Sequence, residues 1–199
     1  MSTISRDELF RLLDARLADP SIAAAQDAEL WERCAVDCAV LVIDLSGFTR
    51  LTRERGILHF LSVYRRALKI ACPLVESHHG RCVKLDADNV IGTFPRAIDA
   101  LVAARAIRDA TVAANVTLSN DERVHVCQGI GFGKILELAD DVYGDEVNIA
   151  FKLGEDVARA EEILVSEAAA EQVRGEDGGK LELSHAVTLG GVAVRYFDA

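Results

Sequence analysis

The order in which strand-like and helix-like segments follow one another limits the fold of this chain more than any other feature. An unbroken apolar run, AVLVIDL at 39–45, is typical of a buried strand. A long helical stretch at 57–78 follows it, and an alternating apolar and polar pattern then turns back on itself around residues 87–89, as a hairpin does. An alanine-rich helix at 96–114 and a glycine-containing strand at 123–138 complete a β-α-β-β-α-β series. This order predicts an α/β fold of the α+β kind, a ferredoxin-like βαββαβ sandwich.

The segments on either side of this series predict additions to the sandwich. After it, the pattern predicts a helix at 145–159, a strand at 161–166 and two short strands at 180–188 and 192–198. Before it, residues 1–37 are predicted to form a helical lead-in, and residues 38–199 the main domain.

The lead-in carries clear helix signals. Ser5 and Glu8 form a capping box, with Ser5 as the N-cap. Asp19 and Pro20 are expected to end this first helix, and Ser21 to cap a second one. Such a lead-in could pack on the main domain, or it could serve as a dimerisation or input element.

Composition and charge exclude several classes of function. The chain has 32 acidic and 22 basic residues, a net charge of −10 and no basic block, so a nucleic-acid partner is not expected. It has no apolar run near the roughly 20 residues that a membrane span needs. Five scattered cysteines are typical of reduced thiols, and with the lack of a secretory signal at the N-terminus they predict a cytoplasmic protein. A small phosphorylated ligand remains compatible with the charge, because metal ions can neutralise it locally.

Two aspartates mark a candidate metal site. Asp44 ends the first strand and is followed by a Ser-Gly turn that leads into a helix, so a carboxylate lies beside backbone N–H groups that could bind phosphate. An aspartate before such a turn could also be a simple helix cap. Asp88 lies at the tip of the next hairpin, where the predicted sheet would bring it beside Asp44. Two adjacent carboxylates near a phosphate-binding turn fit a site for two metal ions.

Four segments together resemble a known family. The segments are VIDLSGFTRL at 42–51, GRCVKLDADNVIGTF at 80–94, VHVCQGIGFG at 124–133 and DVYGDEVNIAFKLGE at 141–155. Their order and spacing are similar to those of class III adenylate/guanylate cyclase homology domains, and the resemblance extends from residue 38 to about residue 197. It implies the nucleotide cyclase type of ferredoxin-like sandwich and a nucleoside triphosphate as substrate.

The resemblance implies a role for each motif residue. Two Mg²⁺ or Mn²⁺ ions per site are expected on Asp44, Asp88 and the backbone carbonyl of Leu45. The phosphates are expected on the backbone N–H groups of Gly47, Phe48 and Thr49.

The resemblance also implies how the nucleoside is recognised. Lys84 falls on the lysine that reads adenine, Asp141 on its acidic partner and Asn148 on the asparagine that orients the ribose. A lysine donor with a carboxylate acceptor matches the N1 acceptor and N6 donor of adenine, whereas guanine presents the reverse. Asp140 is an adjacent alternative to Asp141.

Three departures from the family pattern bear on activity. Lys152 stands where the family has an arginine that stabilises the transition state, so the charge is kept but the bidentate donor pair is lost. Gly190 falls where a phosphate-binding lysine is common, for which Lys134 is a possible but less favoured substitute. Ala87 replaces a usual glycine, and Asp86 adds an acid beside it.

The resemblance therefore predicts a cytoplasmic homodimer with shared active sites that converts ATP to 3′,5′-cyclic AMP and pyrophosphate. Three alternatives remain: a weak or inactive homologue that binds nucleotide or regulates a partner, a cyclase that prefers another triphosphate, and a phosphate-handling enzyme of another type on the same fold, such as a nucleotide polymerase.

Overall fold

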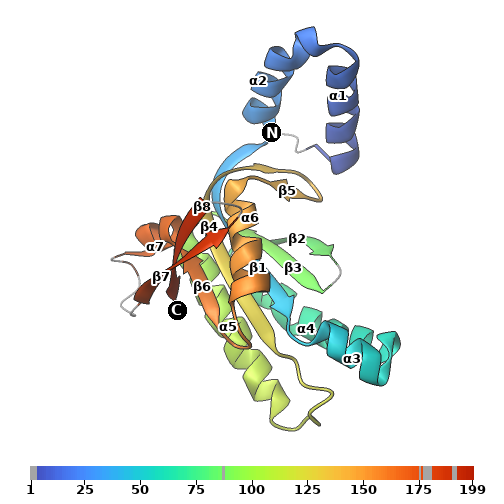
Figure 1. Cartoon of the computed structure of the whole chain (residues 1–199), viewed down its shortest axis with the longest axis vertical. Coiled ribbons are helices and arrows are strands. Elements are labelled where there is room, and N and C mark those ends of the chain that lie inside the picture. The colour runs from blue at the N-terminus through green and yellow to red at the C-terminus, as the bar shows by residue number, and fades with distance from the viewer. Residues whose placement is uncertain (1–3, 87, 175, 177–180, 190–191) are drawn as a thin grey trace.

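The computed structural model describes residues 4–86, 88–174, 176, 181–189 and 192–199 of the chain. An eight-stranded sheet forms its centre, with strand order β2-β3-β1-β4-β6-β8-β7 and β5 paired to β4 (Figure 1). The strands are β1 (Ala35–Leu45), β2 (Arg81–Asp86), β3 (Asn89–Phe94), β4 (Val126–Glu137), β5 (Val142–Tyr143), β6 (Ile163–Ser166), β7 (Glu182–Leu189) and β8 (Val192–Asp198). The helices are α1 (Arg6–Ala18), α2 (Ala23–Cys34), α3 (Phe48–Arg55), α4 (Ile57–Ser77), α5 (Ala97–Asn115), α6 (Asp145–Phe151) and α7 (Glu167–Val173), with a 3₁₀ turn η1 (Pro20–Ile22) and a π-helical segment η2 (Lys152–Val157).

Four strands and two helices make up the predicted sandwich. Strands β2, β3, β1 and β4 lie side by side, each antiparallel to its neighbour, with α4 and α5 in the connections. This arrangement is the βαββαβ order, so the predicted fold class is confirmed. The hairpin expected around residues 87–89 also forms, between β2 and β3.

The two faces of the sheet have separate cores because successive residues of β1 point in opposite directions. Leu41 and Ile43 join a large cluster with buried residues of α4, α5 and α7, whereas Val40 and Val42 pack with residues of α6. Asp44 has the same parity as Val42, which places it on the α6 side.

Glycines in β4 allow α6 and η2 to lie directly on the sheet. A Cβ atom at Gly129 would stand 2.2 Å from the carbonyl oxygen of Ala150, and one at Gly131 would stand 2.4 Å from that of Glu146. A larger residue would therefore push this helical segment away from the strand. The segment carries Asn148 and Lys152, so the glycines set their position.

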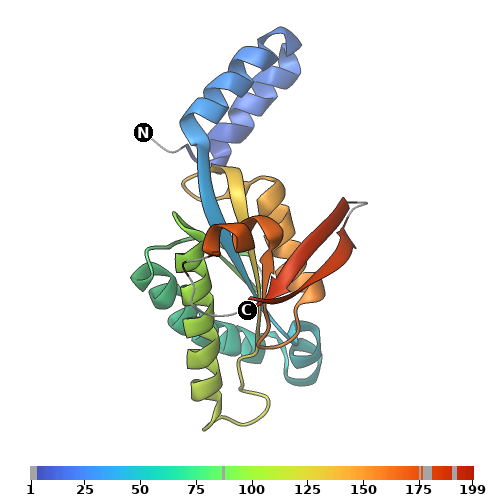
Figure 2. The same cartoon turned by 90° about the vertical axis from the view of Figure 1, so that its left-hand side faces the viewer.

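The lead-in forms a helical hairpin, α1 and α2, at one end of the molecule (Figures 1 and 2). Ser5 caps α1 as predicted, since its hydroxyl accepts the N–H of Glu8. The expected Ser21 cap is wrong: Asp19 caps η1 by accepting the N–H of Ser21, and α2 begins only at Ala23. Strand β1 begins at Ala35, inside the segment expected to be lead-in.

Across the residues that the structure describes, none of the helices is both long enough and apolar enough to cross a membrane.

Candidate active site

Asp44 lies at the end of β1, where its surroundings disfavour the ionised form of its carboxyl group. Its side chain is partly buried, and the Asp88 and Glu155 carboxylates lie near it. Burial first, and then these two like charges, raise the pKa of the Asp44 carboxyl to about 7, against the lowering effect of the Leu45 N–H group. Asp44 is not the cap of the following helix, because the N-cap of α3 is Gly47, with no side-chain cap bond. A divalent cation would relieve this repulsion.

Glu155 is a third carboxylate at this end of the sheet, and the sequence motifs gave no sign of its role. It lies on η2, and its Oε1 accepts a hydrogen bond from Asn89 Nδ2 at 2.6 Å. The other polar atom of that amide, Asn89 Oδ1, is buried with no hydrogen-bond partner among the described residues. Sequence spacing could not reveal this grouping, because it depends on how η2 packs against β4 and β1.

This donor set fits a hard divalent cation. Asp44, Asp88 and the buried oxygen of Asn89 offer oxygen ligands, and the Asp88 and Glu155 carboxylates add to the effect of burial in raising the pKa of Asp44. Mg²⁺ binds through one or two carboxylates and keeps its other positions for water or phosphate. In the part of the chain that the structure describes, no three His, Cys, Asp or Glu side chains group closely enough to hold a metal ion alone.

The turn after Asp44 presents unpaired backbone donors. Gly47 has φ +95°, the left-handed region that glycine tolerates, and α3 starts at the next residue. The first N–H groups of a helix, here those of Phe48 and Thr49, have no partner within it, so they can bind an anion. The Phe48 ring anchors the turn against Phe60, with ring centroids 4.5 Å apart. Leu45 itself pairs with Val126 of β4.

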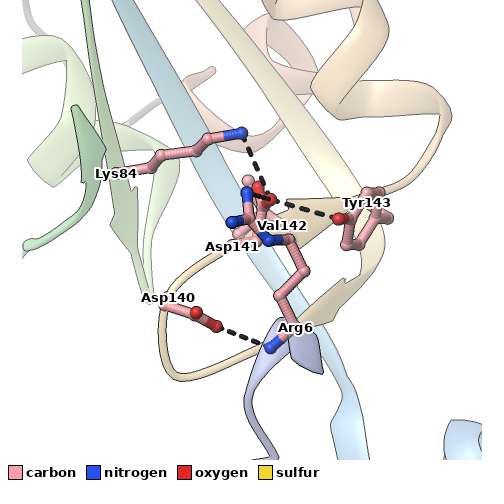
Figure 3. Close-up of polar contacts among 6 residues, drawn as sticks. All are labelled: Arg6, Lys84, Asp140, Asp141, Val142 and Tyr143. Carbon is pink, nitrogen blue, oxygen red and sulfur yellow. Dashed lines mark hydrogen bonds and ion pairs between the residues drawn. The ribbon is translucent and has the colours of Figure 1, made fainter. Parts of the chain in front are cut away.

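Lys84 and Asp141, which are 57 residues apart in sequence, meet in the structure (Figure 3). Lys84 Nζ donates to Asp141 Oδ2 at 3.2 Å, from β2 to the loop between β4 and β5. The Asp141 side chain is only 6% exposed, and the hydroxyl of Tyr143 and the N–H of Val142 also donate to it. Asp140 instead accepts a hydrogen bond from the backbone N–H of Arg6. Of the two candidate acids, Asp141 is thus the one that pairs with Lys84.

Asn148 and Lys152 both lie exposed on the α6–η2 segment, one helical turn apart. Asn148 lies in the second turn of α6, whose N-cap is Gly144 with no side-chain cap bond, so Asn148 does not cap this helix. The Lys152 ammonium makes a salt bridge to Asp156, and this contact raises its pKa. Both side chains are accessible from outside the chain.

Two bacterial proteins are similar to this chain in sequence. Putative adenylate cyclase 3 of Rhizobium meliloti (strain 1021) is 33% identical over 138 residues, which cover 69% of this chain and 23% of that protein. An adenylate cyclase of Streptomyces coelicolor is 32% identical over 159 residues, which cover 76% of this chain and 37% of that protein. The chain therefore spans well under half the length of either relative. No protein-family model matches the chain.

Solved cyclase structures share the fold. An adenylate/guanylate cyclase/hydrolase from Silicibacter pomeroyi has a TM-score of 0.71 at 25% identity, over 82% of this chain and 96% of that one. The guanylyl cyclase Cya2 has a TM-score of 0.71 at 17% identity, over 82% of this chain and 91% of that one, a likeness of fold alone.

The chain is a class III adenylate/guanylate cyclase homology domain.

Two of the departures noted in this cyclase domain lie outside the described residues, at Ala87 and Gly190, and the Asp86 side chain is not described. Lys134, the possible substitute for the phosphate-binding lysine, contacts the lead-in. Its ammonium lies 5.2 Å from the centre of the Trp31 ring in the lead-in. Along β4, Lys134 is seven positions from Cys127, which is the residue paired with Asp44.

Arg50 is a cation near the Gly47 turn that the sequence motifs did not point to. It lies in the first turn of α3, and its Nη2 would stand 3.8 Å from a Cβ atom placed on Gly47. It also pairs with Glu54 at 3.1 Å. The cyclase domain therefore keeps a positive charge beside this turn.

Proposed function

We propose that this cyclase domain converts ATP to 3′,5′-cyclic AMP and pyrophosphate in a homodimer with two shared active sites. The observation that carries the proposal is the Lys84–Asp141 pair within a nucleotide cyclase fold. A lysine can donate to adenine N1 while a carboxylate accepts from adenine N6. Guanine has a donor at N1 and an acceptor at O6, so it would place a donor against the lysine and an acceptor against the carboxylate. ATP is therefore favoured over GTP.

The remaining residues supply the contacts that cyclisation needs. Asp44 and Asp88 would hold two Mg²⁺ or Mn²⁺ ions, whose chemistry is to lower the pKa of the ribose 3′-hydroxyl and to stabilise charge on the leaving pyrophosphate. The N–H groups at the start of α3 would bind phosphate oxygens. Asn148 would orient the ribose, and Lys152 would bind charge that develops on the phosphates.

A homodimer is proposed because two of the site residues are exposed and because the chain also exposes large apolar side chains. Asn148 and Lys152 are exposed. Near the start of α4 and on β2, four large apolar side chains are also exposed, by 45% to 77%: Ile57, Leu58, Leu61 and Leu85. Large exposed apolar side chains that lie close together in sequence, as at the start of α4, favour an interaction surface. A two-fold interface there would give each site residues from both chains.

Product analysis tests the proposal directly. The purified chain is incubated with ATP, GTP, CTP or UTP and Mn²⁺, and the products are identified by mass. Cyclic AMP as the main product is expected. A different cyclic nucleotide would correct the base preference, and the absence of any cyclic product would contradict the cyclase activity.

A second candidate, a domain that binds nucleotide without turnover, is favoured by one observation. The Lys152 ammonium is already engaged by Asp156, and lysine lacks the planar donor pair of arginine. If Lys152 acts in the transition state, Lys152→Ala should lower kcat with little change in KM, and Lys152→Arg should raise kcat. A Lys152→Ala protein that is as active as wild type would show that this position is idle.

A further inference from the structure

The lead-in hairpin docks on the loop that carries Asp141. The N–H of Ala139 donates to the carbonyl of Ile4 at 2.9 Å, and the N–H of Arg6 donates to Asp140 Oδ1 at 2.7 Å. The Ile4 side chain is 1% exposed and packs in one cluster with Leu138, which is fully buried. The chain just before α1 and the loop between β4 and β5 therefore form one packed unit.

From this docked position, Arg6 reaches the proposed base-reading carboxylate. Its Nη1 lies 3.7 Å from Asp141 Oδ2, the same oxygen that accepts from Lys84 and from the Tyr143 hydroxyl (Figure 3). The other oxygen, Oδ1, accepts the N–H of Val142 at 2.9 Å. Two cations from different elements thus share one carboxylate.

Substrate binding would change the charge balance at Asp141. When Lys84 turns to adenine N1, Asp141 gives up some or all of its contact with that cation. A carboxylate that is 94% shielded from water is costly to leave without an opposite charge. Arg6 is the second cation within reach, and its side chain is 45% exposed.

We propose that Arg6 is a positioning residue for base selection: its ion pair holds the Asp141 carboxylate oriented toward the base when Lys84 binds the substrate. This inference rests on the proposed function. It also makes the lead-in part of the substrate-recognition site, because Arg6 is the first residue of α1.

Kinetics of full-length variants test the role of Arg6. Arg6→Gln removes the charge, Arg6→Lys keeps it, and Arg11→Gln makes the same change at an exposed position of the same helix. Because one partner is exposed, Arg6→Gln should lower the ratio of kcat/KM for ATP over GTP by about three- to fivefold. Arg6→Lys should retain most of the ratio, and Arg11→Gln should leave it unchanged. Equal ratios for Arg6→Gln and Arg11→Gln would overturn the proposal.

A double-mutant cycle separates positioning from general stability. If Arg6 acts through Asp141, Arg6→Gln should not lower the ATP/GTP ratio further in an Asp141→Asn protein. An equal drop in both backgrounds would mean that Arg6 acts elsewhere, and this too would overturn the proposal.

Nucleotide binding distinguishes failure of this inference from failure of the proposed function. If the wild-type chain forms no cyclic nucleotide, the same variants are compared by the ratio of Kd values for ATP and GTP with Mn²⁺, measured by calorimetry. A ratio that falls in Arg6→Gln supports the role of Arg6 even though cyclase activity is then contradicted. An unchanged ratio, or no binding of either nucleotide, overturns it.

Discussion

At the residue scale, the Asp44 carboxyl lies where burial and two other carboxylates oppose its charge, and its pKa rises to about 7. The unfolded chain would have an ordinary aspartate pKa of about 4. Between these two values the folded state binds more protons than the unfolded state, so the free energy of unfolding falls as pH rises. Below about pH 4 the carboxyl is protonated in both states and has no effect.

Asp44→Asn should remove this pH dependence in chelator-treated protein. The free energy of unfolding of the variant should equal that of wild type at about pH 4. At about pH 8 it should exceed that of wild type by about 2 kcal/mol, a value reduced for solvent screening. Urea unfolding across this range measures the difference, with Asp14→Asn on exposed α1 as the control. The two proteins should converge when Mn²⁺ is added to wild type. Parallel pH profiles for wild type and Asp44→Asn would contradict the assigned cause.

Base choice also belongs to single residues. Exchanging the pair by Lys84→Glu with Asp141→Cys should reverse the hydrogen-bonding pattern that faces the base. Mismatched donors cost about 1–3 kcal/mol each, so the preference for ATP over GTP should shift by more than about tenfold. Steady-state kinetics with both nucleotides measures the shift. If the ratio does not change, these positions do not read the base.

At the scale of elements, the sequence predicted most of the helices and strands that a local hydrophobic pattern determines. The hydrophobic run at 39–45 lies within β1, and the helices at 57–78 and 96–114 form with nearly the expected bounds. The meeting of Lys84 with Asp141 was expected only from the family resemblance. The grouping of Glu155 with Asp44 and the contact of Arg6 with Asp141 were not predicted. Both contacts depend on how η2 and the lead-in pack on the sheet, and this packing cannot be predicted from the spacing of residues in the sequence.

The contact of β4 with α6 gives a prediction at this scale. Gly129→Ala would place a Cβ atom 2.2 Å from a backbone oxygen of α6, which cannot move aside as a side chain can. We expect a loss of about 1–3 kcal/mol in stability from overpacking, together with lower kcat as Asn148 and Lys152 shift. Gly92→Ala is the control, because its nearest neighbour, at 3.2 Å, is a valine methyl that can adjust. Equal stability losses for the two variants, measured by urea unfolding, would contradict close β4–α6 packing as the cause.

At the scale of the whole molecule, the proposed site is divided between two groups of residues. Asp44 and Asp88 lie at the end of β1 and the tip of the β2–β3 hairpin, whereas Asn148 lies exposed on α6. If a two-fold dimer joins the metal-binding group of one chain to the ribose-binding group of its partner, each dimer has two equivalent sites. Defects in the two groups should then complement each other between chains.

Mixing two inactive proteins tests this arrangement. Asp44→Ala and Asn148→Ala should each be inactive alone, because every site in either homodimer carries the defect. In a mixed dimer, one site collects both defects and the other collects neither. With free exchange about half of the dimers are mixed, so activity should recover to about a quarter of wild type. Recovery should increase with total protein concentration, since dimers form by mass action. A mixture that stays inactive, although subunit exchange is shown by mass spectrometry, would mean that each chain builds its site alone.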